Sequence, residues 1–318
     1  MKKKGLACLL APLLGLLPAL AFAQGAPVRL IVGYAAGGPV DTAARLVAPG
    51  LAKELGANVI VENKPGANAT LAGAAVAKAV PDGTQLWFAA SPTVTISPNI
   101  MKSMTFDPAK DLAAIAPVLS YYNVLVINKD LPFRSLKDLT DYARANPGKV
   151  SYGSAGVGGS NHLSGELFAA RTGTQLTHVP YKGNAPALAD VMGGQLTMMF
   201  DIVGGSRAHI QAGRVRAIAV TSPQRNPSLP DVPTMSEAGL PGFDVGGWFA
   251  VYGPGSTPPA LVQKLNEAMN RTLALAEVKA RLSDMGYEPW TGAPGAVVER
   301  AAKERAMWAT VTKGLQVE

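Results

Sequence analysis

Cysteine is almost absent from this 318-residue chain. The one cysteine, Cys8, lies in an apolar N-terminal segment, so the rest of the chain has no thiol. This excludes disulfides, thiolate metal sites and a cysteine nucleophile beyond that segment. Histidine is also scarce: His162, His178 and His209 show neither H-E-x-x-H nor another metal-ligand spacing. We therefore expect no metal and no cofactor.

Charge is sparse as well. Charged residues make up 16% of the chain, whereas about 25% is usual. The formal net charge is +7, and removal of the three lysines at positions 2–4 lowers it to +4. A charge this small argues against a nucleic-acid binder. The 34 glycines and 25 prolines indicate many turns and argue against a helical bundle.

The N-terminus has the pattern of a secretory signal peptide. Three lysines precede an apolar run over residues 6–20, which ends at the A-x-A sequence Ala21-Phe22-Ala23. The alternative is a membrane anchor, but the run is short of the roughly 20 apolar residues of a spanning helix and contains Pro12 and Pro18. We expect cleavage after Ala23.

Strand and helix patterns alternate in two units. The first is predicted to have strands at 28–32, 58–62 and 85–90 and helices at 41–55 and 69–79. The second is predicted to have strands at 123–128, 149–152, 177–179, 198–201 and 214–221 and helices at 135–146, 161–172 and 185–192. This order predicts a mostly parallel sheet with helices on both faces. Ser135 is the predicted N-cap of its helix, and Thr257 is the predicted N-cap of a last helix whose apolar stripe is core packing.

Glycine-rich loops join strand to helix in both units, over residues 33–41 and 152–162. A helix N-terminus carries unpaired N–H groups and a partial positive charge, and glycine lets a ligand approach the backbone. Neither loop fits the P-loop or the dinucleotide-binding pattern. A plain turn is the alternative for each loop. If the two units face each other, however, both helix N-termini converge on one cleft that suits a carboxylate.

Catalytic patterns are weak. Ser154 lies in Y-G-S-A-G, which is not the G-x-S-x-G elbow of hydrolases. A triad of Ser154 or Ser160 with His162 and Asp201 stays open, as does a plain role of Ser160 as an N-cap and of His162 in the core.

Several motifs together resemble the tripartite tricarboxylate transporter substrate-binding family, the Bug or TctC-like receptors. The resemblance extends over nearly the whole chain after the signal segment. The motifs are A-A-G-G-P-x-D-x-x-A-R at 35–45, E-N-K-P-G-A at 62–67, G-S-A-G-x-G-x-x-x-H-L-x-G-E-L-F at 153–168, V-P-Y-K-G at 179–183, M-F-D at 199–201, L-P-D-V-P-T at 229–234 and W-F-A-V-Y-G-P-G at 248–255. Gly33, Val40 and Asn68 depart from the common family pattern, which leaves the ligand open.

The resemblance implies a type II periplasmic-binding-protein-like α/β fold. Two α/β domains would enclose a central ligand cleft and be joined by two crossovers, near 123–128 and 246–252. Residues 24–124 with 247–318 would form a discontinuous first domain, and residues 125–246 the second. The cleft would close around its ligand.

The family likeness also implies which residues bind the ligand. The first loop would contribute Tyr34, Ala36, Gly37, Gly38 and Asp41, the second loop Ser154, Gly156, Ser160 and His162, and the cleft walls Asn68, Thr70, Ser91, Thr93, Tyr181 and Asp201. Two of these residues, Asp41 and Asp201, are acidic and unfavourable beside an anion. They would either bind an amine or hydroxyl of the ligand or orient a loop.

The resulting expectation is a periplasmic solute-binding protein, not an enzyme, that captures a small di- or tricarboxylate or aromatic acid for a tripartite tricarboxylate-type transporter. Expected partners are the organic acid and the membrane subunits of that transporter, with a sensor kinase as an alternative. We expect a monomer that binds no nucleic acid. The competing hypotheses are an exported serine hydrolase and a ligand-presenting sensor subunit.

Overall fold

The computed structural model describes residues 26–311. The predicted signal peptide, its cleavage after Ala23 and Cys8 all lie outside these residues. Within the described part, no helix is both long and apolar enough to cross a membrane.

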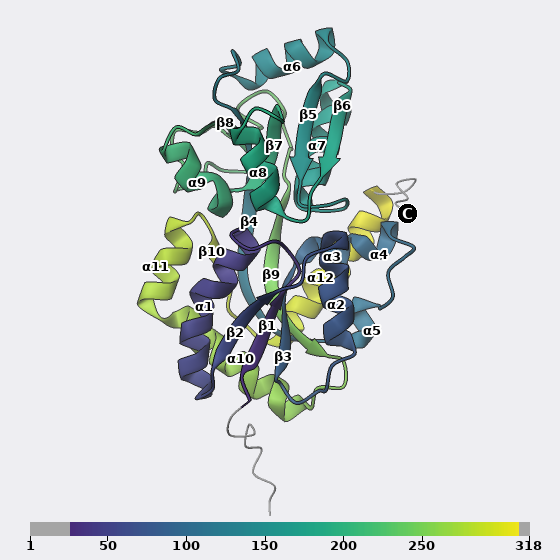
Figure 1. The fold of residues 1–318 in the computed structure, drawn as a ribbon, viewed down its shortest axis with the longest axis vertical. Coiled ribbons are helices and arrows are strands. Elements are labelled where there is room, and N and C mark those ends of the chain that lie inside the picture. The colour runs from purple at the N-terminus through teal and green to yellow at the C-terminus, as the bar shows by residue number, and fades with distance from the viewer. Residues whose placement is uncertain (1–25, 312–318) are drawn as a thin grey trace, which may run out of the picture.

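Two lobes lie one above the other, linked by long strands (Figure 1). The first lobe, lower in the view, is built on three parallel strands in the order β2-β1-β3. Its elements from the N-terminal part of the chain are β1 (Val28–Val32), α1 (Pro39–Leu55), β2 (Val59–Asn63), the short 3₁₀ turn η1 (Ala67–Ala69), α2 (Thr70–Ala77), β3 (Gln85–Ala90), α3 (Ser91–Thr95), α4 (Ser97–Ile100) and α5 (Pro108–Asp111). The C-terminal elements α10 (Pro259–Ala274), α11 (Ala276–Asp284), β10 (Glu288–Pro289) and α12 (Pro294–Val311) return to this lobe.

The second lobe repeats the strand-and-helix pattern. It contains α6 (Leu136–Ala145), β5 (Val150–Ser154), α7 (Ser160–Thr172), β6 (Leu176–Pro180), α8 (Asn184–Met192), β7 (Met198–Ile202), α9 (Val203–Gln211) and β8 (Val215–Val220). Strand β5 pairs in parallel with both β6 and β7. Ser135 is the N-cap of α6, as predicted, and forms a full capping box with Asp138.

Two long strands connect the lobes, β4 (Leu112–Asn128) and β9 (Gly246–Pro254). Over residues 112–122, β4 pairs antiparallel with β9, and β9 pairs with β3 of the first lobe. Over residues 123–128, β4 instead lies between β7 and β8 of the second lobe. This is the expected two-lobed α/β fold with two crossovers. The expected domain limits at 124/125 and 246/247 stay a prediction.

Some local predictions were wrong. The sheet is mixed, not mostly parallel, because β4 and β9 run antiparallel to all their partners. Thr257 is not an N-cap: Pro258 takes that position, and the Thr257 hydroxyl donates to the carbonyl of Pro254. Ser160 is likewise the first residue of α7, and Gly159 is its N-cap. The N-terminal part of β4 and helix α9 were not predicted at all.

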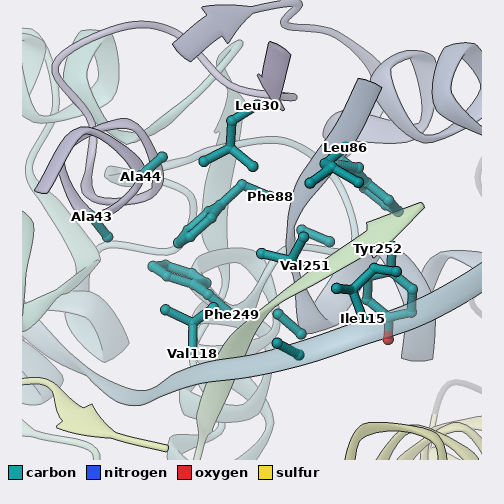
Figure 2. Close-up of a cluster of buried hydrophobic side chains, with 14 of the residues drawn as sticks. Leu30, Ala43, Ala44, Leu86, Phe88, Ile115, Val118, Phe249, Val251 and Tyr252 are labelled. Atoms are coloured by element: carbon teal, nitrogen blue, oxygen red, sulfur yellow. The ribbon is translucent and has the colours of Figure 1, made fainter. Parts of the chain in front are cut away.

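The largest core packs the first lobe around the two connecting strands. Figure 2 shows Phe88 of β3 beside Phe249 of β9, and their ring centroids are 5.7 Å apart. Leu30 and Val251 are also at most 1% exposed. The stripe of α10 predicted to be core packing (Leu261, Leu265, Met269 and Leu273) is buried in the same cluster. The connecting strands are therefore fixed firmly to the first lobe.

Candidate ligand-binding site

A cleft of about 710 Å³ opens between the lobes. The first lobe contributes the ends of β1 and of η1, and the second contributes the loops after β5 and β6. Its lining residues are Gly33, Tyr34, Gly66, Ala67, Asn68, Ala69, Met101, Ser103, Ala155, Gly156, Val157, Pro180, Tyr181, Lys182 and Pro186. Lys182 is the one charged side chain among them.

A smaller cavity lies against the cleft and shares Tyr34, Asn68 and Ala155 with it. It is lined by Tyr34, Val40, Asn68, Ala90, Pro92, Tyr121, Ala155, Gly159, Ser160, Asn161, Asn184 and Ile202, none of which is charged. Its volume is about 10 Å³, which is about the space that one water needs. We call it the inner cavity.

Three helices begin at the inner cavity. The lining includes Val40 in the first turn of α1, Ser160 at the start of α7 and Asn184 at the start of α8. The N-caps of these helices are all glycines, and no side chain caps any of them. Their first N–H groups thus lack the usual side-chain acceptor, and the three helix dipoles favour an anion between them.

Both loops line the same cleft and the same inner cavity, as expected, but each one contacts a different segment of the opposite lobe. The backbone N–H of Ala35 donates to the carbonyl of Lys182 across 3.0 Å. Next to it, Gly183 has φ 143°, and a Cβ there would lie 2.9 Å from the Ala35 nitrogen. A Cβ on Gly156 would lie 3.5 Å from the Cα of Asn68. Glycine is thus what lets the lobes approach this closely.

Asn68 lies at a strained turn of the first lobe. It has φ 48°, and its neighbours Ala67 and Ala69 also have positive φ. Asparagine tolerates this left-handed conformation better than most residues, which gives a physical reason for Asn68 at this position. The Tyr34 hydroxyl donates to Asn68 Oδ1 (3.0 Å), and the Thr93 hydroxyl donates to the Asn68 carbonyl (2.8 Å). These contacts hold the turn against the cleft.

Asp41 orients the first loop. Its buried carboxylate accepts from the Gly37 N–H (2.9 Å), from Arg45 Nε (3.0 Å) and from Asn63 Nδ2 (2.9 Å). Burial by itself raises the pKa of Asp41, but the hydrogen bonds and the charge of Arg45 outweigh it, so the pKa lies below its ordinary value of 3.8. The carboxylate is therefore ionised and fully engaged by its own chain.

Asp201 is engaged in the same way in the second lobe. It accepts from Asn184 Nδ2 and from the Ser206 hydroxyl (2.5 Å). Complete burial raises its pKa to about 6, although these hydrogen bonds oppose the rise. Asp201 lines neither cavity, and it acts on the site by holding Asn184 at the start of α8.

The second loop, which runs over residues 153–159 between β5 and α7, is held by hydroxyl and imidazole groups. The Ser154 oxygen lies 2.7 Å from His178 Nε2 and accepts from the Gly156 N–H (3.1 Å). His162 Nδ1 accepts from the Gly158 N–H (3.2 Å). The triad that the sequence left open is not assembled among the described residues, because Ser154 pairs with His178 and Asp201 pairs with neither histidine.

The residues implied by the family likeness fall into three groups. Tyr34, Asn68, Gly156, Ser160 and Tyr181 line the cleft or the inner cavity. Asp41, Thr70, Ser91, Thr93, Ser154, His162 and Asp201 are buried outside both linings. Ala36 and Gly37 are exposed on the first loop, and Gly38 is the N-cap of α1.

The sequence argument missed several lining residues. Lys182 and Asn184 flank Gly183 at the start of α8, next to the V-P-Y-K-G motif that was noted for Tyr181. Glycine before a helix was the signal that could have found them. Tyr121 carried no such signal, because it lies on a strand that was not predicted. Nowhere in residues 26–311 do three His, Cys, Asp or Glu side chains gather as a metal site would need.

Comparison with known proteins settles the family. Residues 43–316 match the model of the TctC family, described as the tripartite tricarboxylate transporter family receptor. The chain belongs to this family. A relative from Pseudomonas sp. strain P51, the UPF0065 protein in the tcbD-tcbE intergenic region, is 36% identical over 89% of this chain and 84% of its own length. The family is one of periplasmic solute-binding proteins.

Solved structures agree. The periplasmic binding protein BugD is 35% identical, with a TM-score of 0.88 over 91% of this chain and 97% of its own. MatC from Rhodopseudomonas palustris with bound malate is 33% identical, with a TM-score of 0.86 over 90% and 98%. An R. palustris protein with adipate is 34% identical, with a TM-score of 0.87 over 90% and 96%. The type II periplasmic-binding-protein-like fold is thus confirmed.

Proposed function

We propose that this protein captures a small organic acid between its lobes and delivers it to the membrane subunits of a tripartite tricarboxylate-type transporter. The observation that carries the proposal is the convergence of α1, α7 and α8, from both lobes, with uncapped N-termini on one uncharged inner cavity. One carboxylate oxygen would enter this cavity, which has about the space of one water, and accept from backbone N–H groups. Malate and adipate, bound by two structural relatives, support a dicarboxylate.

Lys182 is placed to attract the second end of the ligand. It is the one charged side chain on either lining, and it lies on the larger cleft. A second carboxylate that extends into the cleft would be attracted by it. Asp41 and Asp201 are occupied by Arg45, Asn184 and other groups of the chain itself. Nothing anionic is therefore left on the linings to receive an ammonium group.

The test is titration calorimetry of the mature protein with malate, adipate, tricarboxylates, aromatic acids and acetate. We expect micromolar affinity for a dicarboxylate, which corresponds to about −8 kcal/mol, and weaker binding of acetate. X-ray scattering should show a smaller radius of gyration with saturating ligand, because the lobes close. The absence of binding by any acid up to millimolar concentration would contradict the proposal.

Transport and signalling need a different experiment, because both begin with the same capture. We propose transport, and we expect the tagged protein to recover transporter subunits from membranes in a ligand-dependent way. Recovery of a sensor kinase in their place would favour the sensor subunit. Light scattering checks the expected monomer.

The hydrolase alternative rests on the 2.7 Å contact between Ser154 and His178. Ser154 is fully buried, and its oxygen already bonds the Gly156 backbone, so it is badly placed to attack a substrate. We propose that the protein is not an enzyme. Turnover of chromogenic esters by the wild type that disappears in Ser154→Ala would overturn this.

A further inference from the structure

We propose that His162 is a positioning residue: its neutral imidazole holds the second loop in the shape that faces Asn68, and protonation of the ring releases that loop. The inference rests on the proposed function only where it concerns affinity. The hold itself is a property of the protein without ligand.

The observation that supports this proposal is which atom donates and which accepts in one hydrogen bond. Gly158 N–H donates to His162 Nδ1 across 3.2 Å, and the ring is only 7% exposed. A ring nitrogen can accept only while it carries no proton. The single proton of the neutral ring is then on Nε2, which lies 3.8 Å from Glu166 Oε1. A second proton must go to Nδ1, where it would face the N–H of Gly158.

The loop held in this way forms part of the site. Gly158 has φ 80°, and a Cβ on it would lie 2.8 Å from Ile100 and 3.6 Å from Asn68 Nδ2. Gly156, two residues before it, approaches the backbone of Asn68. Asn68 and Gly156 line the cleft, and Gly159 lines the inner cavity. Release of the Gly158 N–H would therefore shift the surface that closes on the ligand.

The neighbouring ring of His178 disfavours protonation of His162 when His178 is itself charged. Its ring centroid is 4.3 Å from that of His162, and its other face stacks on Tyr152 at 4.8 Å. Two imidazolium ions at this distance would repel each other. The Tyr152 hydroxyl in turn donates to Glu166 (2.6 Å), the one carboxylate of α7 beside His162.

Further elements pack near α7: its Leu163 lies in one cluster with Ile100 of α4 and Trp308 of α12. On α12, Arg300 is bonded to Glu304 and Arg305 to Asp107. On β7 the titratable group is Asp201, which is bonded to Asn184 and Ser206. Burial lowers the pKa of His162 below 6.5, and Glu166 only partly opposes this. Burial and the neighbouring His162 together lower the pKa of His178 to about 4. Because the pKa of His162 is lowered, the hold is complete above pH 6.5 and is lost only as pH falls through the lowered pKa of His162.

The first test needs no ligand. The chain has three histidines, so their ring ¹⁵N signals can be assigned and followed by NMR from pH 7.5 to 4. We expect His162 with the proton on Nε2 at neutral pH. On acidification, the exchange protection of the Gly158 amide should fall in step with protonation of His162. The Gly37 amide, which Asp41 holds, should keep its protection over the same range.

Variants separate positioning from mere packing. His162→Asn keeps an acceptor near Nδ1 but cannot titrate, so Gly158 should stay protected down to pH 4. His162→Ala should lose that protection already at pH 7. The matched control is His209→Gln on α9, which should leave the Gly158 profile unchanged. Protection of Gly158 that does not follow the titration of His162 in the wild type would overturn the proposal, whatever the variants do.

The second test measures affinity for malate and adipate. His162→Ala should bind about tenfold more weakly at pH 7, the equivalent of one hydrogen bond. Below the pKa of His162, wild-type affinity should fall by up to about tenfold per pH unit relative to His162→Asn. The ratio to His162→Asn at each pH removes the effect of protonating the acid itself. A constant ratio would contradict the link to affinity. Failure of both acids to bind would count against the proposed function and leave the NMR result standing.

Discussion

The first loop, residues 33–38, and the second loop, residues 153–159, both join a buried strand to a helix with a glycine N-cap. Their anchors differ. A carboxylate holds the first loop: Asp41 accepts the Gly37 N–H and is itself paired with Arg45. Neutral groups hold the second: Ser154 and His162 accept from Gly156 and Gly158. The same local shape is thus fixed by charge in one lobe and without charge in the other.

Because their anchors differ, the two loops should loosen at different pH values. The pKa of Asp41 is lowered, so its contribution to stability is complete above pH 3.8 and is lost only as pH falls through a still lower value. The pKa of His162 is also lowered, from 6.5, so its contribution is complete above pH 6.5 and is lost as pH falls through that lowered value. Mild acid should loosen the second lobe's loop and leave the first intact.

The largest effect should come from the contact between the first loop and the segment before α8. In Gly183→Ala, the new Cβ would lie 2.9 Å from the Ala35 nitrogen at φ 143°, so the lobes cannot approach fully. We expect dicarboxylate affinity measured by calorimetry to fall by about a hundredfold, or about 2.7 kcal/mol. The control is Gly173→Ala, also at positive φ in the second lobe but with open space around its Cβ. If both variants bind alike, the loop contact does not control closure.

The next largest effect tests the charged anchor. Asp41→Ala removes the acceptor for the Gly37 N–H, for Arg45 Nε and for one N–H of Asn63 Nδ2. We expect the free energy of unfolding to fall by about 2–3 kcal/mol, since hydrogen bonds to charged groups are involved. Denaturant unfolding at pH 7 measures it. A loss equal to that of the exposed pair variant Asp130→Ala would show that the anchor adds nothing.

A smaller effect on affinity is expected at Lys182, on the cleft side of the second lobe. Lys182→Gln removes the one charge on the lining and should weaken adipate binding by about fivefold, in line with a partly screened ion pair. Acetate binding should change little. Salt should weaken the wild type more than the variant. Equal losses for adipate and acetate would place Lys182 at the first carboxylate and would contradict this assignment.

The smallest effects compare two serines of the second lobe. Ser135 caps α6 by side-chain hydrogen bonding, so Ser135→Ala should lower the free energy of unfolding by about 1 kcal/mol. Ser160 does not cap α7, and its oxygen lies 3.4 Å from the Tyr121 hydroxyl. Ser160→Ala removes only this long hydrogen bond from the Tyr121 hydroxyl and should therefore cost about 0.5 kcal/mol, the low end for a hydrogen bond. Thermal unfolding of both variants measures the difference, and a larger loss for Ser160 would reverse the comparison.

Local patterns predicted much of this fold. The elements of the first unit and the capping box at Ser135 follow from apolar spacing and side-chain chemistry close in sequence. The N-terminal part of β4 escaped prediction because it is buried along most of its length and shows no alternation. Its Pro117 also argues against a strand, and the structure accommodates it where the register with β9 shifts.

Helix α9 was not predicted, for a related reason. Gly204 and Gly205 favour no helix by themselves. In the structure, a Cβ on Gly204 would overlap the Tyr287 ring, and one on Gly205 would lie 2.7 Å from Asp201 Oδ2. Gly204 is thus required by contact with Tyr287, a residue distant in the sequence, which no local pattern contains.

The sequence by itself determined the two strand–glycine–helix loops and, through its motifs, the family. Both depend only on residues that are close together in the sequence. Only the tertiary structure decided that both loops line one cleft, that Asp41 and Asp201 are occupied within the protein, and that Ser154 pairs with His178 instead of His162. Each of these depends on residues from different elements brought together by packing, and burial then sets which groups carry charge.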